Sequence, residues 1–557
     1  MRRRVVAASV ALVCLVLTGC ASIPDSGGVQ RGDPAPADPV DLDILALPPA
    51  EGATQEQILD GFITAAQSPR NNYEVAREYL TQAFAEEWDP GEGATIDVLG
   101  ARDIETVDET MLRLEATPAG ALRDNGQYEE PESRAPIPFD YRFEQVNGEW
   151  RISAAPPGIV IDEVSFTGVF RSYTLYFFDP TYRYLVPDVR WFAGRESAQT
   201  SVVQALIAGP AEWLAPGVVS AFPEGVQLTP SAVTISGETA SVSLAGAGLG
   251  DLRTAQRITA QLEESLIGVR TIEQVDLALN GADADPPDLT DPRPDPNPRV
   301  DPRTVVFDGE IFGHLATSGE RIEPIPGLSE QVAALAPSGA ALGPGGESAA
   351  VRTPAGVSLL RVDEDPMVLD PRANPVIPAI DGEGIVWSVP ADAPDQLAWY
   401  GPDGSSAQVD APWTGTAIAA IEVSRDATRI VALLADGLRT NFVAASIQRD
   451  ADGKPIALSP IALRLDDLDG TPLDVAWLDA STVASLTRLA DGTTRIVTQE
   501  LGGFARRFDG PAGGVLIDGG NNDLRALNAA GELVVRSGVG WQVRATGLRL
   551  IASQESG

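Results

Sequence analysis

Hydrophobic residues recur with a helical period early in the chain and alternate with polar residues farther on. Thr54-Gln55-Glu56-Gln57 has the residue types of a capping box. The positions after it place apolar side chains on one helical face, namely Ile58, Leu59, Phe62, Ile63 and Ala66. A second apolar face predicts another helix that ends near Trp88 and Pro90, with Ala76, Tyr79, Leu80, Ala83 and Phe84 on that face. Alternating residues over 139–146 and 150–152, joined by Asn147-Gly148, predict a hairpin, so we expect an α+β domain over 45–160.

The next region, residues 166–281, also mixes the two periods. Strands are predicted over 173–178, 185–191 and 274–279, with a hairpin over 233–244. Helices are predicted over 197–208, ended by Gly209-Pro210, and over 255–266, where Gly268 follows as a C′ residue. This order predicts a second α+β domain. The segment 282–303 is rich in proline and aspartate and predicts a stiff, extended linker.

The last region, residues 304–557, has almost no helical periodicity. Short alternating strands are separated by turns such as Gly401-Pro402-Asp403-Gly404 and Ala490-Asp491-Gly492. Related units begin at Ile421 and Val475, and their spacing of roughly 40 to 50 residues is typical of a propeller blade. We therefore expect an all-β propeller of about six blades, which closes its sheets into a ring. A pair of β-sandwiches is the alternative.

The N-terminus has the order of a secretory signal peptide over residues 1–19. Arg2-Arg3-Arg4 precedes an apolar run, Val5–Leu17, which is shorter than the roughly 20 residues that a bilayer requires. Leu17-Thr18-Gly19-Cys20 resembles the bacterial lipobox. The resemblance implies that Cys20 carries an S-diacylglycerol and an N-acyl chain such as palmitate, followed by a flexible tether over 20–44. We expect a lipid-anchored protein on the extracytoplasmic face of the cell membrane.

Charge and residue usage limit the possible chemistry. The formal net charge is −39, and the sequence has no basic patch of the kind that binds the phosphates of nucleic acids. No nucleic acid partner is therefore expected. His314 is the only histidine, and we predict a half-exposed strand residue rather than a triad or zinc ligand. Gly246–Asp251 departs from a dinucleotide fingerprint, and Asp251 is better interpreted as a helix N-cap.

Two acidic turns, 450–453 and 466–470, resemble parts of calcium loops but lack the glutamate that an EF-hand needs. Paired carboxylates could still support glycosidase chemistry, but 79 acidic residues do not single out a pair. We therefore assign no catalytic, metal-binding or cofactor-binding residue, expect no cofactor, and predict that the protein is not an enzyme. Cys20 is the one assigned site residue.

These features together resemble the LpqB-type lipoproteins of actinobacteria. The resemblance rests on Cys20-Ala21-Ser22-Ile23-Pro24 and on Trp150-Arg151-Ile152-Ser153 with Pro156-Pro157-Gly158. In the middle region, motifs at 206–210, 222–226 and 256–262 resemble a GerMN domain. The two helices that precede antiparallel strands over 45–160 are similar to an NTF2-like domain, and the family ends in a propeller.

The family resemblance implies a non-enzymatic role. LpqB-type proteins are linked to a sensor histidine kinase of the MtrA–MtrB kind and contact its extracytoplasmic domain, which affects cell-wall and division signalling. The expected function is thus an accessory or modulator of such a two-component kinase. The alternative is a cell-surface propeller protein that binds or hydrolyses wall glycans.

Overall fold

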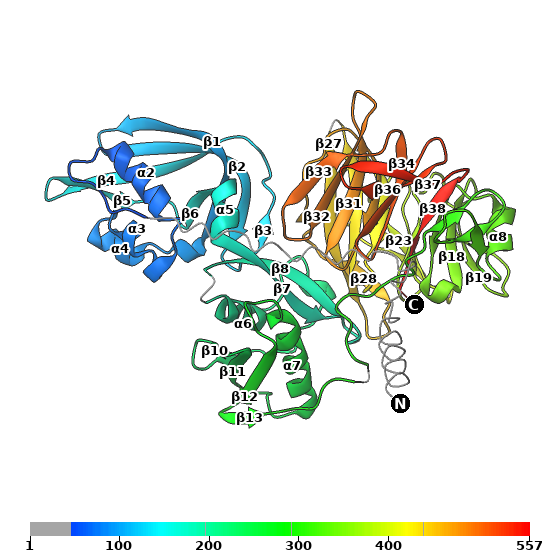
Figure 1. Ribbon diagram of the computed structural model, residues 1–557, viewed down its shortest axis with the longest axis horizontal. Helices are drawn as coiled ribbons and strands as arrows, with labels where there is room; N and C mark the ends of the chain where they lie inside the picture. Colours follow the sequence, from blue (N-terminus) through cyan, green and yellow to red (C-terminus); the bar gives the residue numbers. More distant parts are fainter. Residues whose placement is uncertain (1–45, 195–196, 291, 438, 557) are drawn as a thin grey trace, which may run out of the picture. The chain divides into compact units, whose positions relative to one another are not determined.

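The computed structural model describes residues 46–194, 197–290, 292–437 and 439–556, so the predicted signal peptide, Cys20 and the predicted tether lie outside the described residues (Figure 1). The N-terminal domain, residues 46–169, is a six-stranded sheet with short helices. Its sheet order is β5-β4-β2-β1-β6, with β3 paired to β2. Its elements are α2 (Gln55–Ala65), α3 (Glu74–Arg77), α4 (Gln82–Glu87), β1 (Gly93–Asp108), β2 (Met111–Arg123), β3 (Tyr128–Glu129), β4 (Ile137–Val146), β5 (Glu149–Ala154), β6 (Ile159–Asp162) and α5 (Glu163–Val169).

The predicted capping box and hairpin turn of this domain are confirmed; both depend on residues that are close in sequence. Thr54 Oγ1 accepts a hydrogen bond from the Gln57 amide at 3.3 Å, and the Gln57 side chain accepts from the Thr54 amide at 2.9 Å. The turn at Asn147-Gly148 joins β4 to β5 as predicted. The sheet is mixed rather than wholly antiparallel, because β6 pairs with β1 in parallel.

The prediction of one continuous helix from Ala76 to near Trp88 is wrong, although α4 does end at Glu87 with Trp88 as its C-cap. The chain instead forms α3 and α4, and the extended segment between them pairs with the sheet. The Thr81 amide donates to the Ile152 carbonyl at 2.8 Å, and the Ile152 amide donates to the Tyr79 carbonyl at 2.9 Å. These edge bonds satisfy backbone groups that a continuous helix would have paired internally.

The capping box makes a first testable prediction. Replacing Thr54 by alanine should lower the stability of the N-terminal domain by about 1 kcal/mol, because the Gln57 amide loses its acceptor. Urea denaturation followed by circular dichroism would measure the change. Thr54→Ser keeps the oxygen and should retain most of the stability, so equal losses in both variants would contradict the role of the cap.

The middle domain, residues 170–290, combines two small sheets with two helices. The chain between the parallel neighbours β11 and β12 forms α7, and Asp251 caps this helix by accepting from the Thr254 amide at 2.9 Å, as predicted. Gly268 follows α7 with a φ of +83°, also as expected. The elements are β7 (Phe170–Phe178), β8 (Leu185–Ala193), α6 (Ala198–Ala208), β9 (Gln227–Leu228), β10 (Thr234–Ser236), β11 (Thr239–Ala245), α7 (Leu252–Leu266), β12 (Gln274–Leu279) and β13 (Ala282–Ala284).

The segment predicted as a stiff, extended linker, 282–303, forms strand pairs and buries side chains. Its first residues form β13 and pair with β12. Farther along, the Asp295 amide donates to the Arg183 carbonyl at 2.9 Å, and the Leu185 amide donates to the Asp295 carbonyl at 3.0 Å. Leu289 and Val300 are buried. The segment lacks apolar periodicity, but its backbone still forms hydrogen bonds with β12 and with residues 183 and 185.

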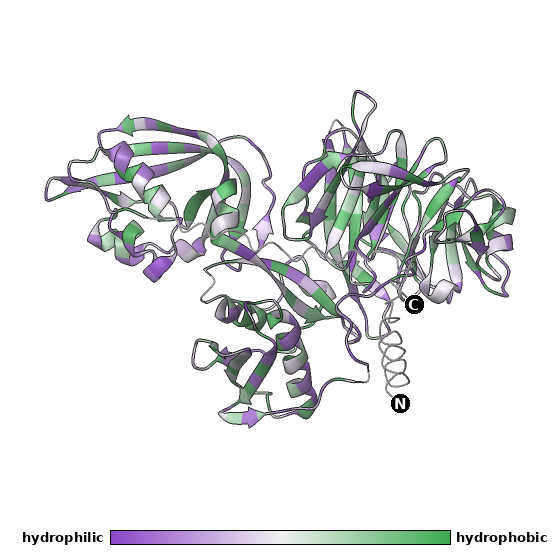
Figure 2. Ribbon diagram, in the orientation of Figure 1, coloured by the Kyte–Doolittle hydropathy of each residue, from purple (hydrophilic) through white to green (hydrophobic). Residues whose placement is uncertain are grey.

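In the residues that the structure describes, the C-terminal region forms a propeller of six blades, five with four strands and one with a fifth strand, which excludes the sandwich alternative. The inner strands β38, β17, β21, β25, β30 and β34 each contact the next, so the ring is closed. Its last strand, β38, pairs with β14 from the start of the domain, so both ends of the region build one blade. The strands carry both hydrophobic and hydrophilic residues (Figure 2).

The bounds of the propeller strands follow, one blade after another, together with the one α-helix described there. They are β14 (Val305–Phe307), β15 (Phe312–Leu315), β16 (Ile322–Pro324) and β38 (Leu550–Gln554); β17 (Gly339–Leu342), β18 (Ser348–Thr353), β19 (Gly356–Arg361) and β20 (Met367–Asp370); β21 (Ala379–Ile380), β22 (Val386–Ser388), β23 (Ala398–Tyr400) and β24 (Ser406–Gln408); β25 (Ala417–Val423), β26 (Arg429–Asp436), β27 (Arg439–Arg449), β28 (Pro455–Leu458) and the added β29 (Leu463–Arg464); β30 (Thr471–Trp477), β31 (Thr482–Arg488), β32 (Thr494–Glu500) and β33 (Ala505–Asp509); β34 (Gly514–Gly520), β35 (Asp523–Asn528), β36 (Leu533–Ser537) and β37 (Gly540–Ala545); and α8 (Ser329–Leu335).

Candidate functional site: the propeller channel

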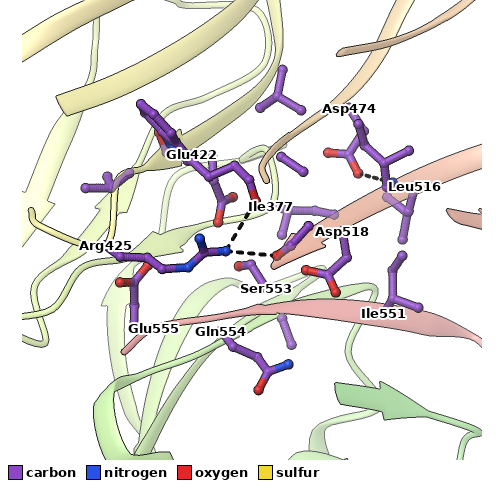
Figure 3. A pocket seen from close by; sticks show the side chains of 17 residues that line it. Ile377, Glu422, Arg425, Asp474, Leu516, Asp518, Ile551, Ser553, Gln554 and Glu555 are labelled. Atoms are coloured by element: carbon purple, nitrogen blue, oxygen red, sulfur yellow. Dashed lines mark hydrogen bonds between the residues drawn. The ribbon is translucent and has the colours of Figure 1, made fainter. Parts of the chain in front are cut away.

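The inner strands of the propeller surround a small cavity lined by acidic side chains (Figure 3). Its polar lining comes from β25, β30, β34 and β38 and from the residues that follow them. These residues are Glu422, Arg425, Asp474, Asp518, Ser553, Gln554 and Glu555. The cavity volume is about 30 Å³, which is room for one or two water molecules and not for a sugar ring.

Strand alternation brings the carboxylates to this place. Glu422 stands between the buried residues Ile421 and Val423, and Asp518 follows the buried residue Ile517. Because successive side chains of a strand point to opposite faces, Glu422 lies on the opposite face of β25 from Ile421 and Val423. Glu422, Asp474 and Asp518 all line the cavity.

Arg425 is the only basic residue among the described residues that line the cavity. Its side chain is buried, and Nη2 donates to the Trp477 carbonyl at 3.2 Å and to the Gly519 carbonyl at 3.0 Å. Its Nε has no hydrogen-bond partner among the described residues. The guanidinium thus joins the inner strands of two blades.

Glu555 fills the channel beside Arg425. Its side chain is only 8% exposed, and its Oε2 has no hydrogen-bond partner among the described residues. The backbone holds it in place, because the Glu555 amide donates to the Leu342 carbonyl at 3.1 Å. The Ser556 hydroxyl donates to the Arg425 carbonyl at 3.5 Å. The segment after β38 therefore occupies space that a channel ligand would need.

Burial raises the pKa values of these carboxyl groups above their ordinary range. Desolvation raises the pKa of Glu422 to about 8, while a hydrogen bond with Ser553 opposes the shift. Desolvation raises the pKa of Asp474 to about 7, against amide hydrogen bonds from Ile517 and Val475. Burial also raises the pKa of Asp518, and it raises the pKa of Glu555 well above its ordinary range. The channel therefore retains protons near neutral pH.

The arrangement fits a structural, proton-holding cluster better than a substrate site. No group of three or more histidine, cysteine, aspartate or glutamate side chains in the described ranges has the geometry to hold a metal ion. Among the same residues, no helix is long and apolar enough to cross a membrane. The cavity can hold water and protons, but its size excludes the wall glycans considered from the sequence.

The other residues singled out from the sequence lie apart from this cavity. His314 is a partly buried residue of β15, as predicted, and burial lowers its pKa. In the turn at 450–453, the Asp450 carboxylate accepts from its own loop, including the Lys454 amide at 2.9 Å. Asp466 pairs instead with Arg507.

Sequence reasoning did not single out the channel carboxylates among the acidic residues. A usable signal existed, because each occupies an otherwise apolar strand: Ile421-Glu422-Val423, Leu473-Asp474-Val475 and Ile517-Asp518-Gly519. The sequence could not say that three separate strands meet around one axis.

The fold and the site define a class of protein with an NTF2-like domain, a GerMN-type domain and a closed β-propeller. Three domain families match the chain in the same order. They are the N-terminal domain of lipoprotein LpqB over residues 48–167, the sporulation and spore germination domain over 174–285, and the LpqB β-propeller domain over 313–546. The chain belongs to the LpqB family of lipoproteins.

Similar proteins support this assignment along most of the chain. Lipoprotein LpqB of Cutibacterium acnes is 28% identical over 528 residues, which cover 88% of this chain and 87% of the relative. Lipoprotein LpqB of Mycolicibacterium smegmatis is 27% identical, with 86% and 85% covered. A structure of tandem GerMN domains of the sporulation protein GerM from Bacillus subtilis covers 21% of this chain and 42% of that one, at 21% identity and a TM-score of 0.18.

Proposed function

We propose that this protein is a lipid-anchored accessory of a sensor histidine kinase of the MtrA–MtrB kind, acting without catalysis on the extracytoplasmic face of the cell membrane. Membership of the LpqB family carries the proposal. The filled propeller channel supports it, because a cavity of about 30 Å³ leaves no room for a wall fragment there. A propeller whose axis is closed still offers an outer surface to a protein partner.

The lipid anchor would raise the local concentration of this protein around the kinase. A lipid on Cys20 confines the protein to the membrane surface, where the kinase also resides. Tethering makes the encounter effectively intramolecular, so a weak contact can be occupied in the cell even if purified domains bind poorly.

Replacing Cys20 by alanine should abolish lipidation and release the protein from the membrane fraction. If Leu17–Cys20 is a lipobox, the thiol of Cys20 is the group that accepts the diacylglycerol. Mass spectrometry of the mature N-terminus would measure the acyl mass. A matched Ser22→Ala variant keeps the cysteine and should remain lipidated. A mature chain that starts at another residue, or that carries no lipid, would show that the anchor assignment is wrong.

Crosslinking in intact cells tests whether this protein contacts the kinase. The lipidated protein should be recovered with the extracytoplasmic domain of the kinase, and Cys20→Ala should lower that yield at least about tenfold because the effective concentration falls. If neither form recovers a kinase while purified protein binds a wall glycan saturably, the signalling role is refuted and the glycan-binding alternative replaces it.

A further inference from the structure

One strand of the N-terminal sheet has an edge without a neighbour. β6 pairs only with Ala94–Asp97 of β1. Beyond an irregularity in the ladder, Arg102–Asp108 pairs with β2 alone. Along its other side, this segment has no strand partner among the described residues. We call Arg102–Asp108 the open edge; it belongs to the half of β1 that leads toward the turn into β2 (Figure 1).

The opposite margin of the same sheet is covered. There β5 is bridged by the segment between α3 and α4, through the amide and carbonyl groups of Ile152. The first half of β1 is covered by β6. The fold therefore covers the first half of β1 and bridges β5 at Ile152, whereas the open edge has no strand partner among the described residues. Unpaired amide and carbonyl groups of an edge can accept an added strand.

The open edge is exposed and acidic. Asp103, Glu105 and Asp108 are exposed, and Val107 is 41% exposed. The one basic residue, Arg102, is engaged by Asp97, with Nε to Oδ2 at 2.6 Å. Strand alternation places Asp103 and Glu105 on one face, whereas Val107 lies at an irregularity in the ladder between Thr106 and Asp108. That face therefore presents two exposed carboxylates.

These charges decide which strand fits. Two open edges from two copies would bring carboxylates opposite each other, and like charges across a strand pair are unfavourable. Acidic edge residues thus oppose self-association, which is how exposed edges are commonly protected. A strand with arginine or lysine at alternating positions would instead meet Asp103 and Glu105 with opposite charge.

We propose that the open edge is a docking site for an extended, basic segment of a partner protein, which adds to the sheet beside β1. The inference rests on the proposed function in one respect, namely that this chain acts by binding a protein. Main-chain hydrogen bonds supply affinity in this mode, and the alternating side chains supply specificity. The complementary charges also make docking sensitive to ionic strength.

The test uses the full-length lipidated protein in its own membranes. A photo-crosslinking amino acid replaces Thr106, which is exposed on the open edge, or Glu144, which is exposed on the interior strand β4. We expect crosslinks from position 106 to an extended partner segment with alternating basic residues, identified by mass spectrometry of the crosslinked peptide, and at least tenfold fewer from position 144.

Charge variants test the recognition. The double variant Asp103→Arg with Glu105→Arg should lower the crosslink yield from position 106 at least about tenfold, because like charges across an interface oppose docking. Asp103→Asn with Glu105→Gln should lower it less. The control Glu92→Arg with Glu144→Arg makes the same charge change at exposed positions away from the edge and should leave the yield unchanged. Unchanged thermal unfolding of each variant verifies that the fold is intact.

Each result separates the inference from the proposed function. If the kinase is captured from position 106 with equal yield after charge reversal, or is captured only from other positions, the docking site is wrong while the accessory role stands. Capture of a second copy of this chain from position 106 also overturns the inference. If no kinase is captured from any position in the three domains, the proposed function itself fails.

Discussion

Replacing Arg190 by methionine should destabilise the middle domain by about 3–5 kcal/mol, because it leaves a buried carboxylate without its partner. Arg190 is 1% exposed and Asp188 4%. Their contact is bidentate, with Nε to Oδ1 at 3.0 Å and Nη2 to Oδ2 at 2.7 Å. Arg190 Nη1 also donates to the carbonyl of Asn125 in the N-terminal domain at 2.8 Å, so the change weakens a contact between domains. Differential scanning calorimetry would measure the shifted transition.

Two variants sharpen this prediction. Adding Asp188→Leu to Arg190→Met removes the unpaired charge, so the double variant should be more stable than the single one. The matched control is Arg113→Met, which breaks the similarly bidentate Arg113–Asp140 pair on the sheet surface. Since both partners there are substantially exposed, the loss should be below about 1 kcal/mol. Equal losses at the two sites would contradict the importance of burial.

Stability of the propeller should fall as the pH rises from about 5 to about 8. The ordinary pKa values of Asp474 and Glu422, 3.8 and 4.5, describe the unfolded chain, whereas folding raises these pKa values to about 7 and about 8. Below the ordinary values both states hold the protons, and the full stability is present. As the pH rises, the unfolded carboxyls ionise first, so stability is lost until the folded pKa is passed.

Asp474→Asn should flatten this dependence and make the propeller more stable at pH 8, by up to about 4 kcal/mol for a pKa raised by about three units. An asparagine oxygen can still accept from the Ile517 amide, which now donates to Asp474 Oδ2 at 2.8 Å. Calorimetry at several pH values would measure the profile.

A matched substitution on the surface provides the control for Asp474→Asn. Asp403 is exposed, and its hydrogen bond with Lys454 lowers the pKa of its carboxyl. Asp403→Asn should therefore leave the fall between pH 5 and pH 8 in place. If Asp474→Asn retained the original profile as well, the channel carboxyl would not be the group that holds the proton.

Structural features that depend on residues close together in the chain could be predicted from the sequence. The capping box at Thr54, the N-cap at Asp251 and the turn at Asn147-Gly148 each depend on residues a few positions apart. The alternation over 304–557 likewise predicted short strands, and their repeated spacing indicated closure into about six blades. The order of motifs along the chain was enough to identify the family, because local residue patterns survive in distant relatives.

Long-range contacts decided the rest. Leu80 leaves a helical pattern because the distant strand β5 offers it a bridge at Ile152. Phe504 of the propeller packs on Tyr128 and Trp191, with ring centroids 4.6 and 5.3 Å apart, although nothing local marks it as a contact between domains.

The sequence by itself determined the helix caps, the hairpin turn and most of the strands, because periodicity and caps are properties of short segments, whereas the extended segment at Leu80 and strand β13 depend on distant partners. Tertiary structure decided where Glu422, Asp474, Asp518 and Glu555 meet, because their strands are far apart in sequence and only ring closure brings them to one axis. It also decided which carboxyls keep their protons. Desolvation depends on what surrounds a side chain in space, and that is fixed only when the propeller closes.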